Sequence, residues 1–311
     1  MSGEWVVPTP LVRRHAATPE GAAWCRRLPS VAEELAARWG LAPVGPAWSG
    51  FNSAVWPVEG SDRARRVLKV THPEVDTGAE AAALRLWRPT DAVVGLLEAD
   101  RERNAMLLER LDGSRSLEEH PDVDEAVTRL AGLLARLHAD EATRPPPGSW
   151  PTTAGEARRM AQGLEQRHAE QPGLLPDAAV RQALDTFGWA AQPHPEDVLL
   201  HFDAHFLNVL ARSGTADETS GWRLIDPLPH VGPVAWEPVA LLRNRWADAA
   251  AAGDPDRALR RRLDQVAEAL GADRRQCRAV AQAVAADNLG WLLGHDPGHP
   301  FVAPYSLMLA W

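Results

Sequence analysis

The chain has 311 residues, with 33 basic and 42 acidic side chains, a formal net charge of −9 and 45% hydrophobic residues. Its length suggests two packed lobes, and its composition is that of a soluble globular protein. No apolar run is long enough to span a bilayer, the amino-terminal residues lack an apolar signal-peptide core, and two cysteines make no disulfide framework. We therefore expect a cytoplasmic protein with reduced thiols and without a membrane or nucleic-acid partner, since nucleic-acid binding would need a basic face.

The charged residues are unevenly distributed. Of the 33 basic residues 32 are arginine, and Lys69 is the one lysine. A lysine retained in such a chain can mark a position where a compact ammonium is needed and a planar guanidinium fails. Residues 1–112 hold 15 acids and 14 bases, whereas residues 113–311 hold 27 acids and 19 bases. The acidic second part could attract a cationic small molecule, although solvated helix faces would give the same excess.

The first third of the chain mixes helical and strand patterns. Residues 30–39 predict a short helix with Ser30 as its N-cap, and residues 77–87 predict a second helix. Strands are expected where apolar runs of strand length are bounded by turn-like residues, at 53–58, 65–71, 92–98 and 104–109. These elements predict a small sheet with a helix inserted after the strand that carries Lys69.

After residues 111–113 the pattern becomes mostly helical. Apolar residues recur at helical spacing, which predicts helices at 123–138, 154–170, 176–191 and from 237 onward. A loop at 143–151, a short strand at 198–201 and a β-hairpin at 208–226, with its turn at 213–221, separate these helices. We predict an α+β protein with a small β-rich amino-terminal lobe (1–108), a hinge (109–113) and a larger, mostly helical carboxyl-terminal lobe (114–311).

The segment from His201 to Asn208 carries the densest set of reactive side chains. Asn208 precedes the first strand of the predicted hairpin and Asp226 follows the second, so antiparallel pairing would bring the two together. Amide and carboxylate oxygens are ligands suited to Mg²⁺. Asp203, on the loop facing that metal, is placed to accept a proton from a substrate hydroxyl. His201 lies on the incoming strand, where it can hold the loop by hydrogen bonding.

Lys69 supplies a second part of this chemistry. An ammonium on a sheet strand can bind phosphate oxygens as a point charge. Eleven residues later, Glu80 lies on the apolar face of the predicted helix, and Lys69 is its natural ion-pair partner, with Asp76 as a competitor. The template for phosphoryl transfer is matched by the order of these features along the chain: a lysine on a strand, a glutamate on a helix, H-x-D-x-x-x-x-N, a hairpin and I-D-P. Each motif alone is common.

The chain resembles the aminoglycoside phosphotransferase family, in particular its streptomycin 6-kinase and hydroxyurea-kinase branch, which has the protein-kinase-like bilobal fold. The similarity runs from about residue 20 to 295 and is carried by ALRLW (83–87), AMLLERLDGSRSL (105–117), LLHFDAHFLNVL (199–210) and WRLIDPLPHVGP (222–233). The resemblance implies an ATP site between the lobes and a substrate site on the carboxyl-terminal lobe. It supports the roles given to Lys69, Asp203, Asn208 and Asp226. It also implies that residues 109–111, through Glu109 and Leu111, offer backbone groups to adenine.

Two stretches depart from the family pattern. Where the family often shows G-D-P-x-[YF]-D, residues 232–237 read GPVAWE, so that Glu237 replaces the second aspartate. The phosphate loop lacks G-x-G-x-x-G and contains Ser49, Gly50 and Ser53, so hydroxyls and backbone N–H groups must hold the phosphates.

We therefore expect an ATP- and Mg²⁺-dependent O-phosphotransferase that acts on a hydroxyl of a small cationic molecule. A streptomycin-type aminoglycoside is the first candidate, and another hydroxylated, amino-sugar or hydroxyurea-like substrate is the alternative. Candidates for the substrate pocket are Glu237, Asp287 and Trp291, although surface carboxylates and a core tryptophan would give the same pattern.

Two further interpretations stay open. His201, Asp203 and His205 could form the zinc triad of a hydrolase, although that leaves Lys69 and the hairpin unexplained. A kinase-like protein could also bind nucleotide without catalysis.

Overall fold

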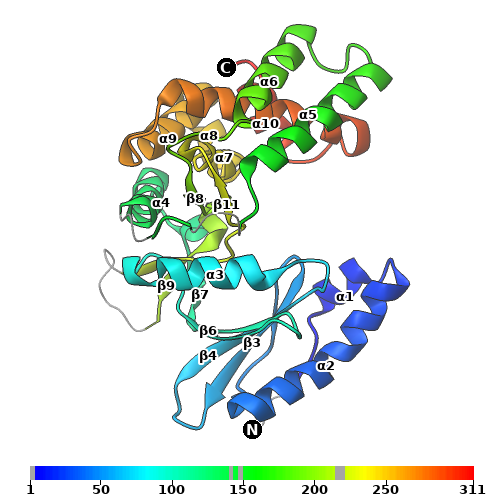
Figure 1. Ribbon diagram of the computed structural model, residues 1–311, viewed down its shortest axis with the longest axis vertical. Coiled ribbons are helices and arrows are strands. Elements are labelled where there is room, and N and C mark those ends of the chain that lie inside the picture. The colour runs from blue at the N-terminus through cyan, green and yellow to red at the C-terminus, as the bar shows by residue number, and fades with distance from the viewer. Residues whose placement is uncertain (1–3, 140–142, 146–149, 214–220) are drawn as a thin grey trace. The chain divides into compact units, whose positions relative to one another are not determined.

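The computed structural model describes residues 4–139, 143–145, 150–213 and 221–311. The chain divides into two compact units: unit 1 comprises Met1–Asp112 and Arg212–Thr215, and unit 2 comprises Gly113–Ala211 and Ala216–Trp311. Unit 1 holds the largest sheet and unit 2 holds most of the helices (Figure 1). Within the described residues, no helix is long and apolar enough to cross a membrane.

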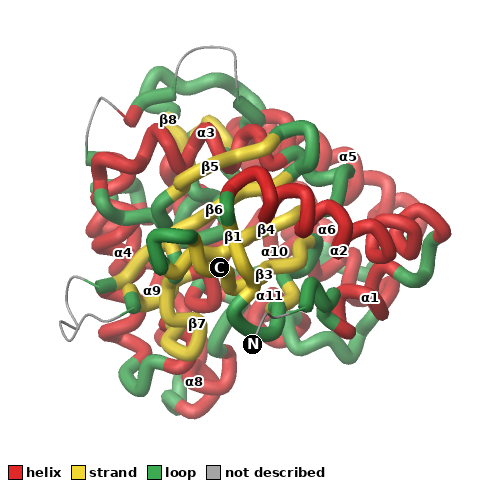
Figure 2. The backbone as a smooth tube through the Cα atoms, turned by 90° about the horizontal axis from the view of Figure 1, so that it is seen from below, coloured by secondary structure: helices red, strands yellow, loops and turns green. Residues whose placement is uncertain are grey.

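Unit 1 is built on an antiparallel sheet of order β1-β3-β4-β6-β5, with β2 paired to β3 (Figure 2). Its strands are β1 (Leu41–Pro43), β2 (Trp48–Ser49), β3 (Ser53–Gly60), β4 (Arg65–Thr71), β5 (Leu96–Asp100) and β6 (Ala105–Glu109). The predictions of strands at 53–58, 65–71 and 104–109 are confirmed. The prediction of a strand at 92–98 is wrong at its start, because residues 92–94 are buried but precede β5, which begins at Leu96. The apolar run there marks burial rather than strand pairing.

Three helices complete unit 1: α1 (Thr9–His15), α2 (Pro19–Trp39) and α3 (Thr77–Trp87). The prediction of α3 is confirmed. The helix predicted at 30–39 begins much earlier, because the side chain of Thr18 accepts from Gly21 N and caps the amino terminus of α2. Ser30 therefore lies inside α2 and is not its N-cap.

The two faces of the sheet in unit 1 have different partners. Side chains of α2, including Trp24 and Leu28, pack with Trp56 and Leu68 in one hydrophobic core. Because successive strand residues point to opposite faces, Lys69 lies on the other face, where α3 runs (Figure 1). Strand alternation thus separates the packing face from the face that carries the lysine.

Unit 2 is mostly helical and is organised around α10 (Arg274–His295), which is extensively buried and packs against α5, α6, α9 and α11. The other helices are α4 (Val123–His138), α5 (Thr153–Glu170), α6 (Asp177–Ala190), α7 (Val239–Leu242), α8 (Trp246–Ala251), α9 (Pro255–Ala269) and α11 (Val302–Met308). The predicted helices at 123–138, 154–170 and 176–191 are confirmed to within one residue at each end. Helices also follow residue 237, as predicted.

Short strands and 3₁₀ turns make up the other elements of the described residues. The strands are β7 (Leu111–Ser116), β8 (Val198–Leu200), β9 (Val209–Arg212), β10 (Trp222–Leu224) and β11 (His230–Gly232), in sheets of order β10-β9-β7 and β11-β8. The 3₁₀ turns are η1 (Arg88–Thr90), η2 (Leu117–Glu119), η4 (Phe206–Asn208) and η5 (Val234–Trp236). The predicted hairpin is confirmed by the antiparallel pairing of β9 with β10, whereas most of its predicted turn, residues 214–220, lies outside the described residues. The predicted hinge, 109–113, contains the end of β6 and the start of β7.

Candidate active site

Lys69 and Glu80 form a buried ion pair within unit 1. Lys69 Nζ lies 2.8 Å from Glu80 Oε1 and 3.0 Å from Oε2, and the two residues are 6% and 8% exposed. Asp76 does not compete for the lysine, because its side chain caps α3 by accepting from Gly78 N. Glu80 thereby holds the ammonium of the flexible Lys69 side chain in one position over the sheet.

The three residues predicted to bind phosphate lie where β2 turns into β3: Ser49 ends β2, Gly50 lies in the turn and Ser53 begins β3. Gly50 N donates to Ser53 O at 2.9 Å, and the Ser49 hydroxyl donates to Gly50 O at 2.9 Å. A Cβ atom at Gly50 would lie 2.3 Å from Ser53 Oγ, so a larger residue there would force the turn or Ser53 to move. The structure thus brings Ser49, Gly50 and Ser53 into one tight turn.

Arg14 of α1 holds this loop, a role that the sequence pattern does not indicate. Its Nη1 donates to Phe51 O at 3.0 Å and to Gly50 O at 3.4 Å, and its guanidinium lies 4.3 Å from the centre of the Phe51 ring. The positive charge of Arg14 therefore offsets the partial negative charges of the Gly50 and Phe51 carbonyl oxygens, which would otherwise repel phosphate oxygens. Arg14 lies 36 residues before Gly50 in the chain, and a contact over that separation leaves no periodic pattern in the sequence.

The residues predicted to contact adenine are partly engaged within unit 1. Glu109 N donates to Gly95 O at 2.7 Å, and the Glu109 carboxylate accepts from Gly95 N and from Arg212 Nε. Of the Glu109 backbone groups, only the carbonyl can then serve adenine. Leu111 is buried at the start of β7. Contacts from Glu109 and Leu111 to adenine stay a prediction.

Asp203 lies in the loop after β8, and its two carboxylate oxygens have different partners. Oδ1 accepts from Arg243 Nη2 at 3.2 Å, and Oδ2 accepts from Asn208 Nδ2 at 3.2 Å, with His205 Nε2 at 3.5 Å. Burial alone would raise the pKa of Asp203, but His205 and Arg243 outweigh it and lower that pKa. The carboxylate is therefore ionised at neutral pH, which is the form that can accept a proton.

Asn208 and Asp226 lie at the ends of the paired strands β9 and β10. Ile225 N donates to Asn208 O at 2.9 Å, which continues the pairing to the residue before Asp226. The Asn208 amide nitrogen is committed to Asp203, so its carbonyl oxygen is the atom that can serve as a ligand. Asp226 has a φ of 52°, a left-handed conformation that is uncommon outside glycine and is often found at functional sites. This pair of hard oxygen donors fits Mg²⁺.

Glu237 is a buried support for the loop that carries Asp203. Its carboxylate accepts from His201 N at 2.7 Å, from Phe202 N at 3.2 Å and from the His138 ring at 3.0 Å. Burial alone would raise the pKa of Glu237, but its hydrogen bond with His138 and the neighbouring His201 outweigh burial and lower that pKa. All these donors belong to the protein itself. This placement contradicts the expectation that Glu237 binds substrate.

His201 joins the Asp203 loop to the end of the hairpin. The residue is fully buried, its carbonyl accepts from Leu228 N at 3.0 Å, and its Nε2 lies 3.1 Å from Ile225 O. Burial lowers the pKa of His201, so the ring is neutral and donates from Nε2. Its neighbour Phe202 has a φ of 66°, a strained conformation for a bulky residue. We assign His201 a positioning role, because its hydrogen bonds hold the loop rather than reach a reacting atom.

The alternative zinc triad is not assembled. The ring nitrogen Nε2 of His201 is engaged with Ile225 O. Among the residues that the structure describes, no group of three His, Cys, Asp or Glu side chains is placed to hold a metal ion. The hydrolase interpretation therefore has no structural support.

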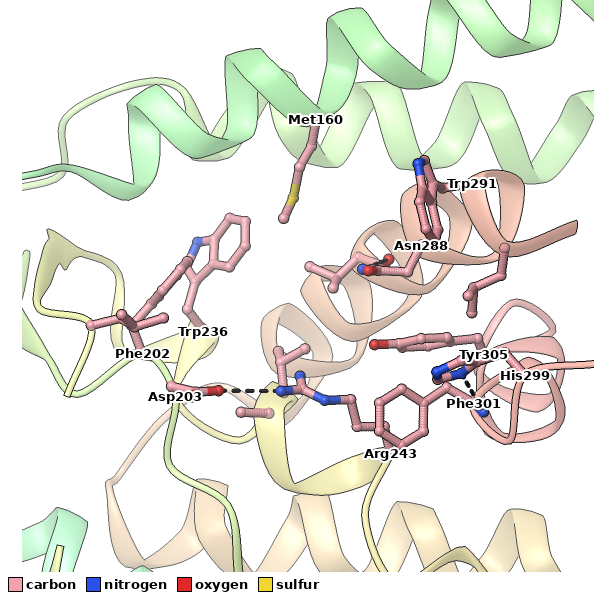
Figure 3. Close-up of a pocket in the computed structure, with 15 residues that line it drawn as sticks. Met160, Phe202, Asp203, Trp236, Arg243, Asn288, Trp291, His299, Phe301 and Tyr305 are labelled. Atoms are coloured by element: carbon pink, nitrogen blue, oxygen red, sulfur yellow. Dashed lines mark hydrogen bonds and ion pairs between the residues drawn. The ribbon is translucent and has the colours of Figure 1, made fainter. Parts of the chain in front are cut away.

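A pocket of about 430 Å³ within unit 2 opens beside Asp203 (Figure 3). Most of its lining is apolar or aromatic and comes from Met160, Phe202, Leu228, Trp236, Val239, Ala240, Val284, Trp291, Leu292, Phe301 and Tyr305, together with Asp203, Arg243, Asn288 and His299. Trp291 lines the same pocket as Asp203, and its contact with a substrate stays a prediction. Asp287 does not line it and forms an ion pair with Arg167, contrary to expectation.

The chain is similar to a family of antibiotic resistance kinases. The family described as aminoglycoside/hydroxyurea antibiotic resistance kinase matches residues 38–294. A streptomycin 6-kinase of Streptomyces glaucescens is 36% identical over 98% of this chain and 95% of its own length. A hydroxyurea phosphotransferase of Kitasatospora aureofaciens is 36% identical over 85% of this chain and 73% of its own length.

Solved structures support the fold. A macrolide 2′-phosphotransferase of Brachybacterium faecium superposes with a TM-score of 0.55 at 19% identity, over 90% of this chain and 97% of its own. The predicted α+β, protein-kinase-like fold is thereby confirmed. The chain belongs to the aminoglycoside/hydroxyurea antibiotic resistance kinase family and is a phosphotransferase.

Proposed function

We propose that the chain transfers the γ-phosphate of ATP to a hydroxyl of a streptomycin-type aminoglycoside. The observation that carries this proposal is the position of Asp203, an ionised carboxylate in the wall of a largely aromatic pocket in unit 2. The same carboxylate contacts Asn208, one of the two hairpin residues suited to Mg²⁺. A base, an acceptor pocket and metal ligands thus adjoin one another in unit 2.

In the proposed reaction the acceptor hydroxyl gives its proton to Asp203 as its oxygen attacks the γ-phosphorus. The new O–P bond forms while the bond to the β-phosphate oxygen breaks, and ADP leaves. Lys69, oriented by Glu80, binds phosphate oxygens, and Arg14 holds the loop that contains Gly50. Mg²⁺ bound by Asn208 and Asp226 would neutralise phosphate charge. Glu237 and His201 keep the Asp203 loop in place, so the residues act mainly by positioning and charge stabilisation.

The test is a direct assay of the purified full-length chain with ATP, Mg²⁺ and streptomycin, in which mass spectrometry detects one added phosphoryl group. We expect stoichiometric formation of ADP and phosphorylated streptomycin. Tight ATP binding without transfer to streptomycin or to any other hydroxylated acceptor would instead support the interpretation of a non-catalytic nucleotide-binding protein.

A hydroxyurea-like acceptor is the second candidate. Among the described residues that line the pocket, Asp203 is the one carboxylate, and it is already paired with Arg243. A lining with so little acidity favours a neutral, hydroxyurea-like acceptor over an acceptor with several positive charges. The same assay with hydroxyurea distinguishes the two candidates by kcat/KM, and we expect the larger value for streptomycin.

A further inference from the structure

The turn between β2 and β3 lacks G-x-G-x-x-G, so its backbone groups decide how it can bind phosphate. Gly50 N donates to Ser53 O at 2.9 Å and closes the turn. Phe51 and Asn52 lie between these two residues and outside any strand. Among the residues that the structure describes, the N–H groups of Phe51 and Asn52 have no hydrogen-bond partner. The turn therefore carries two successive backbone donors that a ligand can use.

Arg14 determines the direction of these two N–H groups. Its Nη1 donates to Phe51 O at 3.0 Å and to Gly50 O at 3.4 Å, so both carbonyl oxygens are turned toward Arg14. Every peptide bond in the described part of the chain is trans, and in a planar trans peptide the N–H points opposite to the C=O. The N–H groups of Phe51 and Asn52 therefore point away from Arg14.

Further contacts hold α1 against the turn. The Arg14 guanidinium lies 4.3 Å from the centre of the Phe51 ring. The next residue, His15, stacks on His72 with ring centroids 4.9 Å apart and an angle of 14°. His72 N in turn donates to Asn52 O at 2.8 Å. The end of α1 thus meets the turn directly through Arg14 and indirectly through His72.

The charge of Arg14 also strengthens the two N–H groups as donors. A cation at a carbonyl oxygen polarises the peptide and makes its N–H a better hydrogen-bond donor. Successive N–H groups that point to one side form a concavity that binds anions. The anionic part of a nucleotide is its phosphate chain. The arrangement therefore fits the phosphates of a nucleotide and offers nothing to its nucleoside part.

We infer that Arg14 is a positioning residue for nucleotide binding, because it turns the N–H groups of Phe51 and Asn52 toward the phosphates. That the phosphates approach this turn rests on the proposed function. Arg14 acts through the two peptides rather than on the nucleotide, since its Nη1 is already engaged by two carbonyl oxygens. An amino-terminal helix thereby supplies the rigidity that a turn with one glycine needs to present its N–H groups.

The test titrates the full-length chain with MgADP and with adenosine, and follows the backbone amide NMR signals of Phe51 and Asn52. ADP should shift both signals downfield, because each N–H donates to a phosphate oxygen, whereas adenosine should leave them in place. In Arg14→Gln the Kd for ADP should rise about tenfold, which corresponds to about 1.4 kcal/mol, while the Kd for adenosine stays within about twofold.

Two further variants separate position from charge. A single nitrogen of Arg14 makes both hydrogen bonds, so the ammonium of Arg14→Lys can replace it and the Kd for ADP should stay within about threefold of wild type. Arg13→Gln removes the same charge from an exposed neighbouring position of α1 and should leave the Kd for ADP unchanged. Arg14 is itself exposed, so its replacement should not prevent folding.

An unchanged Kd for ADP in Arg14→Gln would overturn the inference. So would a wild-type titration in which ADP leaves the amide signals of Phe51 and Asn52 in place, because the phosphates would then bind elsewhere. An equal loss of affinity in Arg13→Gln would also contradict it, since the charge of the helix would then act in place of peptide orientation. The titrations contain no acceptor. A failure to phosphorylate streptomycin would therefore contradict the proposed function and leave the ADP result as an independent finding.

Discussion

Lys69 Nζ lies 2.8 Å from Glu80 Oε1, and both side chains are almost fully buried in unit 1. A buried ion pair adds little net stability, because the loss of hydration offsets the attraction between the charges. Its effect here is to fix the position of the single ammonium in a chain that otherwise uses arginine. This relationship links an unusual composition to the phosphate chemistry of the family.

Lys69→Arg should lower kcat/KM for ATP by about 10²-fold, because a planar fork replaces a point charge in a buried site. Steady-state kinetics with varied ATP measures this effect. Arg65→Lys, an exposed position on the same strand, should leave kcat/KM unchanged. Wild-type kinetics in Lys69→Arg would remove the argument that this position requires lysine.

Glu80→Gln should lower the free energy of unfolding by about 3 kcal/mol, because it removes the carboxylate that balances a buried ammonium. Urea denaturation followed by circular dichroism measures the change. Glu98→Gln, on the exposed part of β5, should shift the free energy of unfolding by less than about 0.5 kcal/mol. Equal stability of the two variants would show that Glu80 does not balance Lys69.

Glu237→Gln should lower kcat by about tenfold and leave KM for ATP unchanged, because a neutral amide holds the N–H groups of His201 and Phe202 less tightly. A purely structural defect would reduce the fraction of enzyme that is active. The kcat per active site and the KM of the folded molecules would then be unchanged. Active-site titration separates these cases. Glu196→Gln, which is exposed, serves as the control.

The stability of the protein should fall as the pH decreases below about 6.5. Burial lowers the pKa of His201 in the folded chain, so the unfolded chain binds a proton there that the folded chain does not. The stability that neutral His201 contributes is complete above the pKa of this histidine in the unfolded chain. It is lost as the pH falls below that value, by up to about 1.4 kcal/mol per pH unit. Urea titrations at pH 7.5, 6.5 and 5.5 should show a smaller loss in His201→Gln than in the wild type. Identical slopes would contradict the assignment of a neutral buried imidazole.

The sequence predicted features that depend on local pattern. Paired strands determine which residues end a hairpin, so the proximity of Asn208 to Asp226 follows from β9 and β10. Helical spacing likewise places Glu80 on the inner face of α3. The order of such elements along the chain explains why the fold could be predicted.

Features that depend on long-range packing were missed or misassigned. Arg14 reaches the loop at Gly50, and Arg243 reaches Asp203 from 40 residues away. Glu237 was expected in the substrate pocket, yet it is buried beneath the Asp203 loop and hydrogen-bonded there. The direction in which a side chain points inside a packed helical unit depends on neighbours far away in the chain, and no spacing rule captures it.

We propose that Asp203 is the base for phosphoryl transfer, and Asp203→Asn removes that function with the smallest change in shape. The amide keeps the size of the side chain but cannot accept the proton of the acceptor hydroxyl. Transfer to streptomycin and nucleotide affinity should be measured on the same preparation, by mass spectrometry and by calorimetry. We expect kcat to fall by at least about 10²-fold while Kd for ATP stays within about twofold of wild type. A variant with kcat close to that of the wild type would contradict it.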